Sequence, residues 1–157
     1  MEGFIMAIVG LSFLYGIEYI RNQKYFDIIP LTSFSDKTLL ELITNMLNFH
    51  KETQGVKSIP KIKVADLSKE KSEYDDSRVE GLYVYNLKMI IIDVNHLKSR
   101  NRKLKDLARI VSHEWQHYVD HLNGITYDTV GVDMCENRAT KFAVRGSRQI
   151  IKNLEFN

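Results

Sequence analysis

Cysteine, net charge and long apolar runs are all scarce in this chain. The 157 residues include one cysteine, Cys135, and a single thiol excludes an internal disulfide. The 22 Lys and Arg residues nearly balance the 20 Asp and Glu residues, so the net charge of +2 implies no particular class of partner. With 44% hydrophobic and 27% charged residues, the chain has an ordinary globular composition and suits one domain over residues 1–157.

The longest apolar segment begins at Phe4 and ends at Ile17, which is shorter than the roughly 20 residues of a membrane span. A secretory signal would need a positive start and a small-residue cleavage site, whereas this chain has Glu2 and no clear site. We expect a cytoplasmic protein in which residues 1–30 form an apolar helix and a connection, packed on the domain or on a partner chain. A short membrane anchor with Arg21 on the cytoplasmic side is the alternative.

A basic run occupies residues 98–105. Such runs bind nucleic acid or lipid head groups in some proteins, but more often they are solvated linkers. No nucleic-acid-binding motif accompanies the run and no aromatic residue alternates with its charges, so we predict no nucleic-acid partner.

Residues 31–79 predict a helix, a strand and a polar loop. Residues 36–50 have the pattern of an amphipathic helix with Ser35 as N-cap and Gly55 beyond its end. Residues 59–65 alternate like a strand, and Pro60 places that strand at an edge or marks its start. The helix residues predicted to face the core are Leu39, Leu40, Ile43, Met46 and Leu47.

Residues 80–157 predict a hairpin followed by two helices. The β-rich runs 80–86 and 88–94 are joined so tightly that a hairpin is the simplest arrangement. The whole order predicts an α+β fold with helices on one face of a small sheet of three or four strands.

His113-Glu-Trp-Gln-His117 is the most informative stretch of the sequence. Two histidines four apart on a helix point the same way, a spacing that suits two imidazole nitrogens binding one Zn²⁺. Glu114 then lies beside the water that the metal activates. The alternative is a solvated polar face with two histidines by chance.

The flanking residues support a helix. Asn101 is the predicted N-cap of a helix from Arg102 to about Leu122, and Asn123-Gly124 is a stop signal. The two histidines lie opposite an apolar stripe of Leu104, Leu107, Ala108, Val111, Trp115, Tyr118 and Leu122.

A catalytic zinc typically takes three protein ligands and leaves one position for water. The metzincin pattern HExxHxxGxxH is excluded, because Val119 and Asn123 occupy the positions of its glycine and third histidine. Residues 133–143 predict a second helix in which Glu136 shares one face with small residues, so that a carboxylate can approach a metal on another helix. Glu136 is our predicted third ligand. Weaker candidates are Asp133, Asp128 and Cys135.

The HExxH motif followed by Glu136-Asn-Arg-Ala-Thr-Lys-Phe-Ala143 resembles the gluzincin zinc metallopeptidases. The likeness covers roughly residues 80–150 and is closest to the small ImmA/IrrE-like, minigluzincin and lethal-factor-like catalytic domains. It implies a zincin-like fold with His113, His117 and Glu136 as zinc ligands and Glu114 as general base. It also implies that one hairpin strand pairs with a substrate peptide. Thermolysin-like members place an aspartate where this chain has Thr140, so carboxylate support for a histidine must come from elsewhere.

Asp120 is the candidate for that support, as acceptor of the second N–H of His117. Candidates for stabilising the transition state are Tyr127, His121 and Tyr118. His121 could instead be a further metal ligand, a pocket residue or a surface histidine. The predicted function is zinc-dependent hydrolysis of peptide bonds in a protein or peptide substrate, with Glu114 moving the proton. The alternatives are a catalytically inactive zincin-like scaffold in a larger assembly and a non-peptidase metal hydrolase.

Overall fold

The computed structural model describes residues 23–71 and 78–156. The expectation for the segment from Phe4 to Ile17 therefore lies outside the described residues. Within the described ranges, no helix combines the length and the apolar character needed to cross a bilayer.

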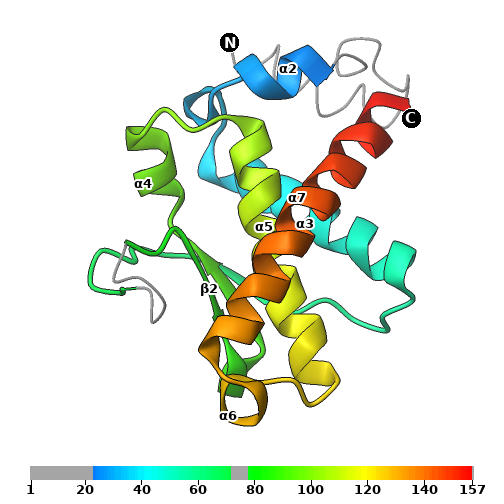
Figure 1. Cartoon of the computed structure of the whole chain (residues 1–157). Helices are drawn as coiled ribbons and strands as arrows, with labels where there is room; N and C mark the ends of the chain where they lie inside the picture. The colour runs from blue at the N-terminus through cyan, green and yellow to red at the C-terminus, as the bar shows by residue number, and fades with distance from the viewer. Residues whose placement is uncertain (1–22, 72–77, 157) are drawn as a thin grey trace.

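The described residues form six α-helices, two 3-10 helices and three strands, which confirms the α+β class (Figure 1). Their order is α2 (Gln23–Ile28), η1 (Leu31–Ser33), α3 (Asp36–Gln54), β1 (Lys61–Val64), β2 (Gly81–Val84), η2 (Tyr85–Leu87), β3 (Met89–Ile92), α4 (Val94–Ser99), α5 (Leu104–Leu122), α6 (Tyr127–Val130) and α7 (Val132–Phe156).

The sheet is mixed and has the order β1-β3-β2. The predicted hairpin is confirmed: β2 and β3 pair antiparallel with Tyr83 opposite Ile90, and β1 joins β3 in parallel with Ile62 opposite Ile90. Paired residues share a face, and the buried side chains of Tyr83, Ile90 and Ile92 define the core face. On that face β1 contacts α3 and β2 contacts α5. Helices α3 and α5 therefore pack on the core side of the sheet.

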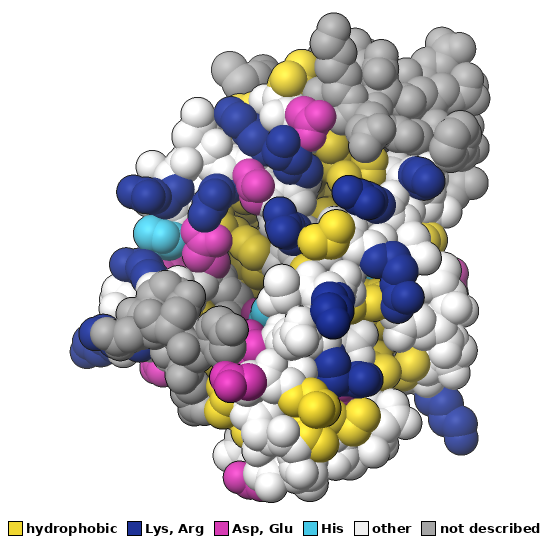
Figure 2. All heavy atoms as spheres, viewed as in Figure 1, with side chains coloured by type: hydrophobic (Ala, Val, Ile, Leu, Met, Phe, Trp, Pro, Cys, Tyr) yellow, Lys and Arg dark blue, Asp and Glu magenta, His cyan; other side chains and the backbone are white. Residues whose placement is uncertain are grey.

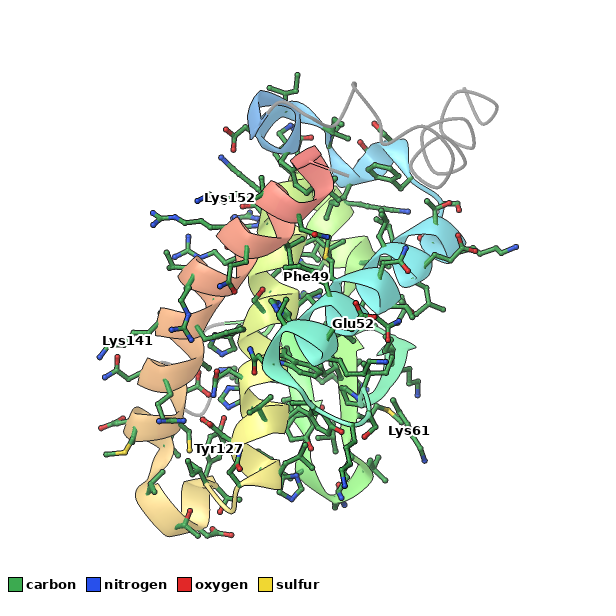
Figure 3. All side chains as sticks on the ribbon, turned by 90° about the vertical axis from the view of Figure 1, so that its right-hand side faces the viewer. Phe49, Glu52, Lys61, Tyr127, Lys141 and Lys152 are labelled. Atoms are coloured by element: carbon green, nitrogen blue, oxygen red, sulfur yellow. The ribbon has the colours of Figure 1, made fainter. Side chains whose placement is uncertain are left out.

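Helix α5 is the centre of the molecule, since it packs against α2, α3, β2 and α7. Figure 3 shows it between α7 and α3. The predicted apolar stripe is buried from Leu104 to Tyr118, and Trp115 is fully enclosed. The stripe prediction is wrong at Leu122, which is 46% exposed because the helix ends there, beyond its neighbours.

The predicted start of α5 is also wrong. Asn101 does not cap this helix; it follows α4 with a positive φ of 51°. The N-cap is Lys103, whose backbone N–H donates to the Asp106 carboxylate at 2.8 Å. The predicted stop is confirmed: Gly124 takes φ 73°, a conformation that glycine adopts at no steric cost.

Helix α3 begins at the predicted cap, where Ser35 Oγ accepts from the Thr38 N–H at 3.1 Å. It ends at Gly55, which is left-handed with φ 65°. The prediction for Leu40 is wrong, because this side chain is 38% exposed. His50 is fully buried instead, where its Nε2 lies 2.9 Å from Ser112 Oγ on α5.

The C-terminal part differs most from the prediction. The helix expected over residues 133–143 runs from Val132 to Phe156 as α7, and the short helix α6 precedes it. Helix α7 lies along α5, and its later turns approach α2 (Figure 1). Burial along it follows a helical period, with Ala139, Phe142, Ala143 and Ile150 inward.

Candidate metal centre

His113 and His117 lie one turn apart on α5, and Glu136 lies on the second turn of α7. The two helices pack side by side, and this packing brings the three residues together. One ligand atom from each residue lies within 4.8 Å of the other two. The predicted approach of the Glu136 carboxylate to both rings is therefore observed.

The three side chains form a closed triangle of contacts. His113 Nε2 lies 3.2 Å from His117 Nε2 and 3.2 Å from Glu136 Oε2, and His117 Nε2 lies 3.2 Å from Glu136 Oε1. Ligands at tetrahedral positions about 2.0–2.1 Å from a zinc ion stand roughly 3.3 Å apart. The spacing and the donor types, two imidazole nitrogens and one carboxylate, thus fit a divalent metal such as Zn²⁺.

The cluster keeps the Glu136 carboxyl ionised. Burial alone raises its pKa, but the contacts with His113, His117 and Tyr127 outweigh that effect and hold the pKa well below its usual range. For His113, burial lowers the pKa, and the opposing effect of Glu136 and Glu114 leaves it raised. An anionic carboxylate is the form that binds a metal.

Glu114 lies in the same cleft and is only 5% exposed. Burial raises the pKa of its carboxyl above the ordinary value, although the two histidines and the backbone N–H of Tyr83 oppose the rise. A carboxylate with a raised pKa is a better proton acceptor near neutral pH than an exposed one.

Tyr127, at the start of α6, reaches the cluster from the side. Its hydroxyl donates to Glu136 Oε1 at 2.6 Å, and its ring stands nearly perpendicular to that of His117. Burial, followed by the contact with Glu136, raises the pKa of this phenol far above its ordinary value, so the hydroxyl stays protonated. Tyr127 can therefore orient the carboxylate as well as face a substrate.

Asp120 does not have the predicted role. Its two oxygens accept from Arg138 at 2.8 and 2.7 Å, and Oδ1 also accepts from Gln116 at 2.7 Å. His117 Nδ1 is buried and has no hydrogen-bond partner among the described residues. The prediction failed because the helical spacing of Asp120 from His117 does not reveal that a guanidinium on α7 occupies this carboxylate.

His121 and Tyr118 lie away from the cluster. His121 Nδ1 is 2.8 Å from the Tyr83 hydroxyl, and Tyr118 points through the core to Ser58, 2.9 Å from its Oγ. Neither side chain is among those that line the cleft, so the structure does not bring these two candidates to the site.

The three weaker candidates for the third ligand also lie outside the cluster. Asp128 and Asp133 are exposed, and the Cys135 thiol is buried with its pKa raised by that burial.

The cluster opens into a cleft of about 730 Å³ between β2, α5 and α7. The Asp93 N–H donates to the Glu80 carbonyl, so Glu80 is a residue whose backbone groups face β3. In an antiparallel pair every second residue does so, and the N–H and C=O groups of Gly81 and Tyr83 therefore point away from β3. Both residues line the cleft, and β2 is an edge strand among the described strands. An extended peptide can pair with such an edge.

Gly81 sets the distance between β2 and α5. A Cβ atom at this position would stand 2.6 Å from Ile110 Cγ2 and 3.0 Å from Glu114 Oε1. Only glycine lets the strand come this close to Glu114.

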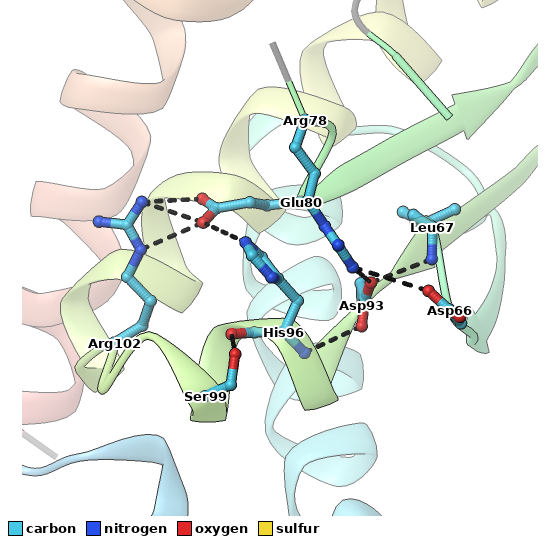
Figure 4. Close-up of polar contacts among 8 residues, drawn as sticks. All are labelled: Asp66, Leu67, Arg78, Glu80, Asp93, His96, Ser99 and Arg102. Atoms are coloured by element: carbon cyan, nitrogen blue, oxygen red, sulfur yellow. Dashed lines mark hydrogen bonds and ion pairs between the residues drawn. The ribbon is translucent and has the colours of Figure 1, made fainter. Parts of the chain in front are cut away.

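A polar network holds the start of β2 in place (Figure 4). Arg78 donates to the buried Asp93 carboxylate at 2.9 Å, and Asp93 also accepts from two backbone N–H groups. Arg102 donates to both oxygens of Glu80, at 2.9 and 3.2 Å. These contacts fix the position of the first residues of β2, which line the cleft.

The sequence reasoning missed Gly81, Tyr85 and Arg138. Tyr85 lines the cleft with its hydroxyl buried and without a partner among the described residues. The one available signal was Gly81 at the head of a β-rich run, since glycine inside a strand often marks a close approach.

Comparisons of the chain with known protein families, with curated proteins and with solved structures find no match.

Proposed function

We propose that the protein is a zinc-dependent metallopeptidase of the gluzincin type, with a zincin-like arrangement of its edge strand and two site helices. The observation that carries the proposal is the convergence of Glu136 on His113 and His117, with Glu114 in the same cleft. A scaffold without catalysis needs no buried carboxylate at position 114, where burial costs free energy.

His113, His117 and Glu136 would hold the ion. When bound, Zn²⁺ supplies Lewis acidity, which activates water and polarises the carbonyl of a peptide bond. The Tyr127 hydroxyl keeps the Glu136 carboxylate oriented through their 2.6 Å hydrogen bond.

Glu114 would act as the general base and then as the acid. Its raised pKa favours taking a proton from the attacking water and delivering that proton to the leaving amine. Gly81 brings the edge of β2 close to this carboxylate, so a peptide paired with the strand would present its backbone there.

The decisive experiment is cleavage of a peptide library by the zinc-loaded protein and by Glu114→Gln. We expect wild type to hydrolyse peptide bonds and the variant to lose about 10²–10⁴-fold in rate, because it lacks the proton acceptor. The variant should keep its zinc content and its circular dichroism spectrum.

The outcomes separate the three candidate functions. Zinc binding without cleavage of any peptide by wild type would favour the scaffold. Hydrolysis confined to non-peptide esters or amides would favour another metal hydrolase. Equal rates for wild type and Glu114→Gln would contradict the proposed role of Glu114.

A further inference from the structure

Helix α7 is strongly basic beyond the metal centre. Residues 137–154 include five Lys and Arg residues and no Asp or Glu, in a chain whose net charge is only +2. Arg138 pairs with Asp120. The other four, Lys141, Arg145, Arg148 and Lys152, form no ion pair with any residue that the structure describes.

These four cations lie on one side of the helix. Their offsets of 0, 4, 7 and 11 residues fall within roughly 60° of one another at about 100° per residue, and all four are exposed. Figure 3 shows Lys141 and Lys152 projecting from α7 to the same side. Arg145 also covers the ring of Phe142, with its guanidinium carbon 5.3 Å from the ring centroid.

Arg109 connects this stripe to the candidate metal centre. It lies on α5 one turn before His113, is exposed, and lines the cleft together with Asn137 and Thr140 of α7. It too forms no ion pair among the described residues. We call Arg109, Lys141, Arg145, Arg148 and Lys152 the basic face; Figure 2 shows dark-blue side chains gathered over α5 and α7.

The surroundings of the basic face favour one class of partner. Stable binding to a membrane surface usually combines cations with exposed apolar side chains that enter the bilayer, but the exposed large hydrophobic residues of the described chain lie outside residues 137–152. Single-stranded nucleic acid would require aromatic rings for base stacking, and the one aromatic residue on this part of α7, Phe142, is only 4% exposed. An acidic peptide needs the charges alone.

We propose that the basic face binds an acidic segment of the protein substrate, adjacent in sequence to the bond that enters the cleft. This inference rests on the proposed peptidase function. Arg109 would contact the acidic residues nearest the cleft, and the stripe on α7 would contact the more distant ones. Long-range attraction would also guide the substrate to the site.

The test uses the full chain carrying Glu114→Gln, loaded with zinc, so that binding is measured without turnover. The probe is a fluorescein-labelled peptide of alternating Glu and Gly, compared with its Gln counterpart by anisotropy. The variant Arg109→Gln/Lys141→Gln/Arg148→Gln removes three charges and leaves Arg145 on Phe142. We expect this variant to bind the Glu peptide about tenfold more weakly, with a reduced salt dependence.

The matched control is Lys57→Gln/Lys61→Gln/Lys63→Gln, which removes three exposed charges at and before β1. Figure 3 shows Lys61 on the opposite side from Lys141. This variant should bind the Glu peptide as tightly as the parent protein. Equal losses in both triple variants, or no preference of the parent for the Glu peptide, would overturn the inference.

Two further arms separate the partner classes. Tighter binding of poly(U) or of phosphatidylserine vesicles than of the Glu peptide, lost in the first triple variant, would also overturn the inference. If the zinc-loaded wild-type protein cleaves acidic and neutral library peptides at equal rates, this inference alone is contradicted. If the wild-type protein cleaves no peptide while Glu114→Gln still binds the Glu peptide, the peptidase function is contradicted instead.

Discussion

Arg138 of α7 binds Asp120 of α5 through two hydrogen bonds, from Nε to Oδ2 at 2.8 Å and from Nη2 to Oδ1 at 2.7 Å. The carboxylate is 1% exposed, whereas the guanidinium is 45% exposed. Glu136 lies two residues before Arg138, so this pair fixes α7 beside α5 at the level of the metal cluster.

We predict that Arg138→Gln loses about 2 kcal/mol of unfolding free energy, because a buried carboxylate keeps only Gln116 as a side-chain partner. Zinc affinity should fall as well, since Glu136 is then less firmly placed. Urea denaturation and zinc titration measure the two effects. Arg148→Gln, an exposed change on the same helix, should shift stability by less than about 0.5 kcal/mol.

Zinc should stabilise the folded chain through the three predicted ligands. At a free zinc concentration about 100 times the dissociation constant, linkage gives about 2.7 kcal/mol, which raises the melting temperature. His117→Ala and Glu136→Gln should lose this shift, while Asp133→Asn should retain it, because Asp133 is exposed and outside the cluster. Differential scanning fluorimetry with zinc or EDTA provides the measurement; a zinc shift retained in Glu136→Gln would contradict the ligand assignment.

Gly81→Ala should separate β2 from α5. The added Cβ would meet Ile110 Cγ2 at 2.6 Å, and we expect a loss of about 1–3 kcal/mol in stability with reduced peptidase activity. Combining it with Ile110→Ala removes that contact, so the double variant should lose less stability than the sum of the two single changes. If the losses of unfolding free energy in Gly81→Ala and Ile110→Ala add up to the loss in the double variant, the contact of the new Cβ atom with Ile110 is not the cause of the destabilisation.

His50 predicts a pH dependence of stability. Burial lowers its pKa from 6.5 to about 4, and Ser112 Oγ donates to the Ala108 carbonyl, which leaves Ser112 to accept from His50 Nε2–H. Above pH 6.5 the ring is neutral in both states, so it has no effect on stability. As the pH falls from 6.5 to 4, only the unfolded chain gains the proton, and the folded state loses about 3 kcal/mol relative to it.

The variant for this prediction is His50→Gln, which keeps an N–H donor for Ser112 but does not titrate. Denaturation in EDTA at pH 7 and pH 4, where metal release makes no contribution, should show a smaller decline in the variant. An identical decline in both proteins would contradict the predicted neutrality of His50.

The fold was partly predictable because its strongest signals are local. Ser35 and Gly55 mark the two ends of α3 by their own backbone chemistry, and the hairpin follows from two β-rich runs with one short connection. The start of α5 was not predictable because Asn101 is the better N-cap by its side chain, whereas Lys103 has no side-chain acceptor. Lys103 occupies the position because its backbone N–H donates to the Asp106 carboxylate. The length of α7 was missed because its basic stripe carries no local stop signal.

The sequence by itself identified His113, Glu114 and His117 as site residues. It also predicted that the two histidines point the same way, because a spacing of four residues on a helix brings two side chains to one face. Only the tertiary structure decided which acidic groups join them. Glu136 reaches the rings and Asp120 turns to Arg138 because α7 packs along α5, and no spacing within one helix specifies how a second helix lies against it.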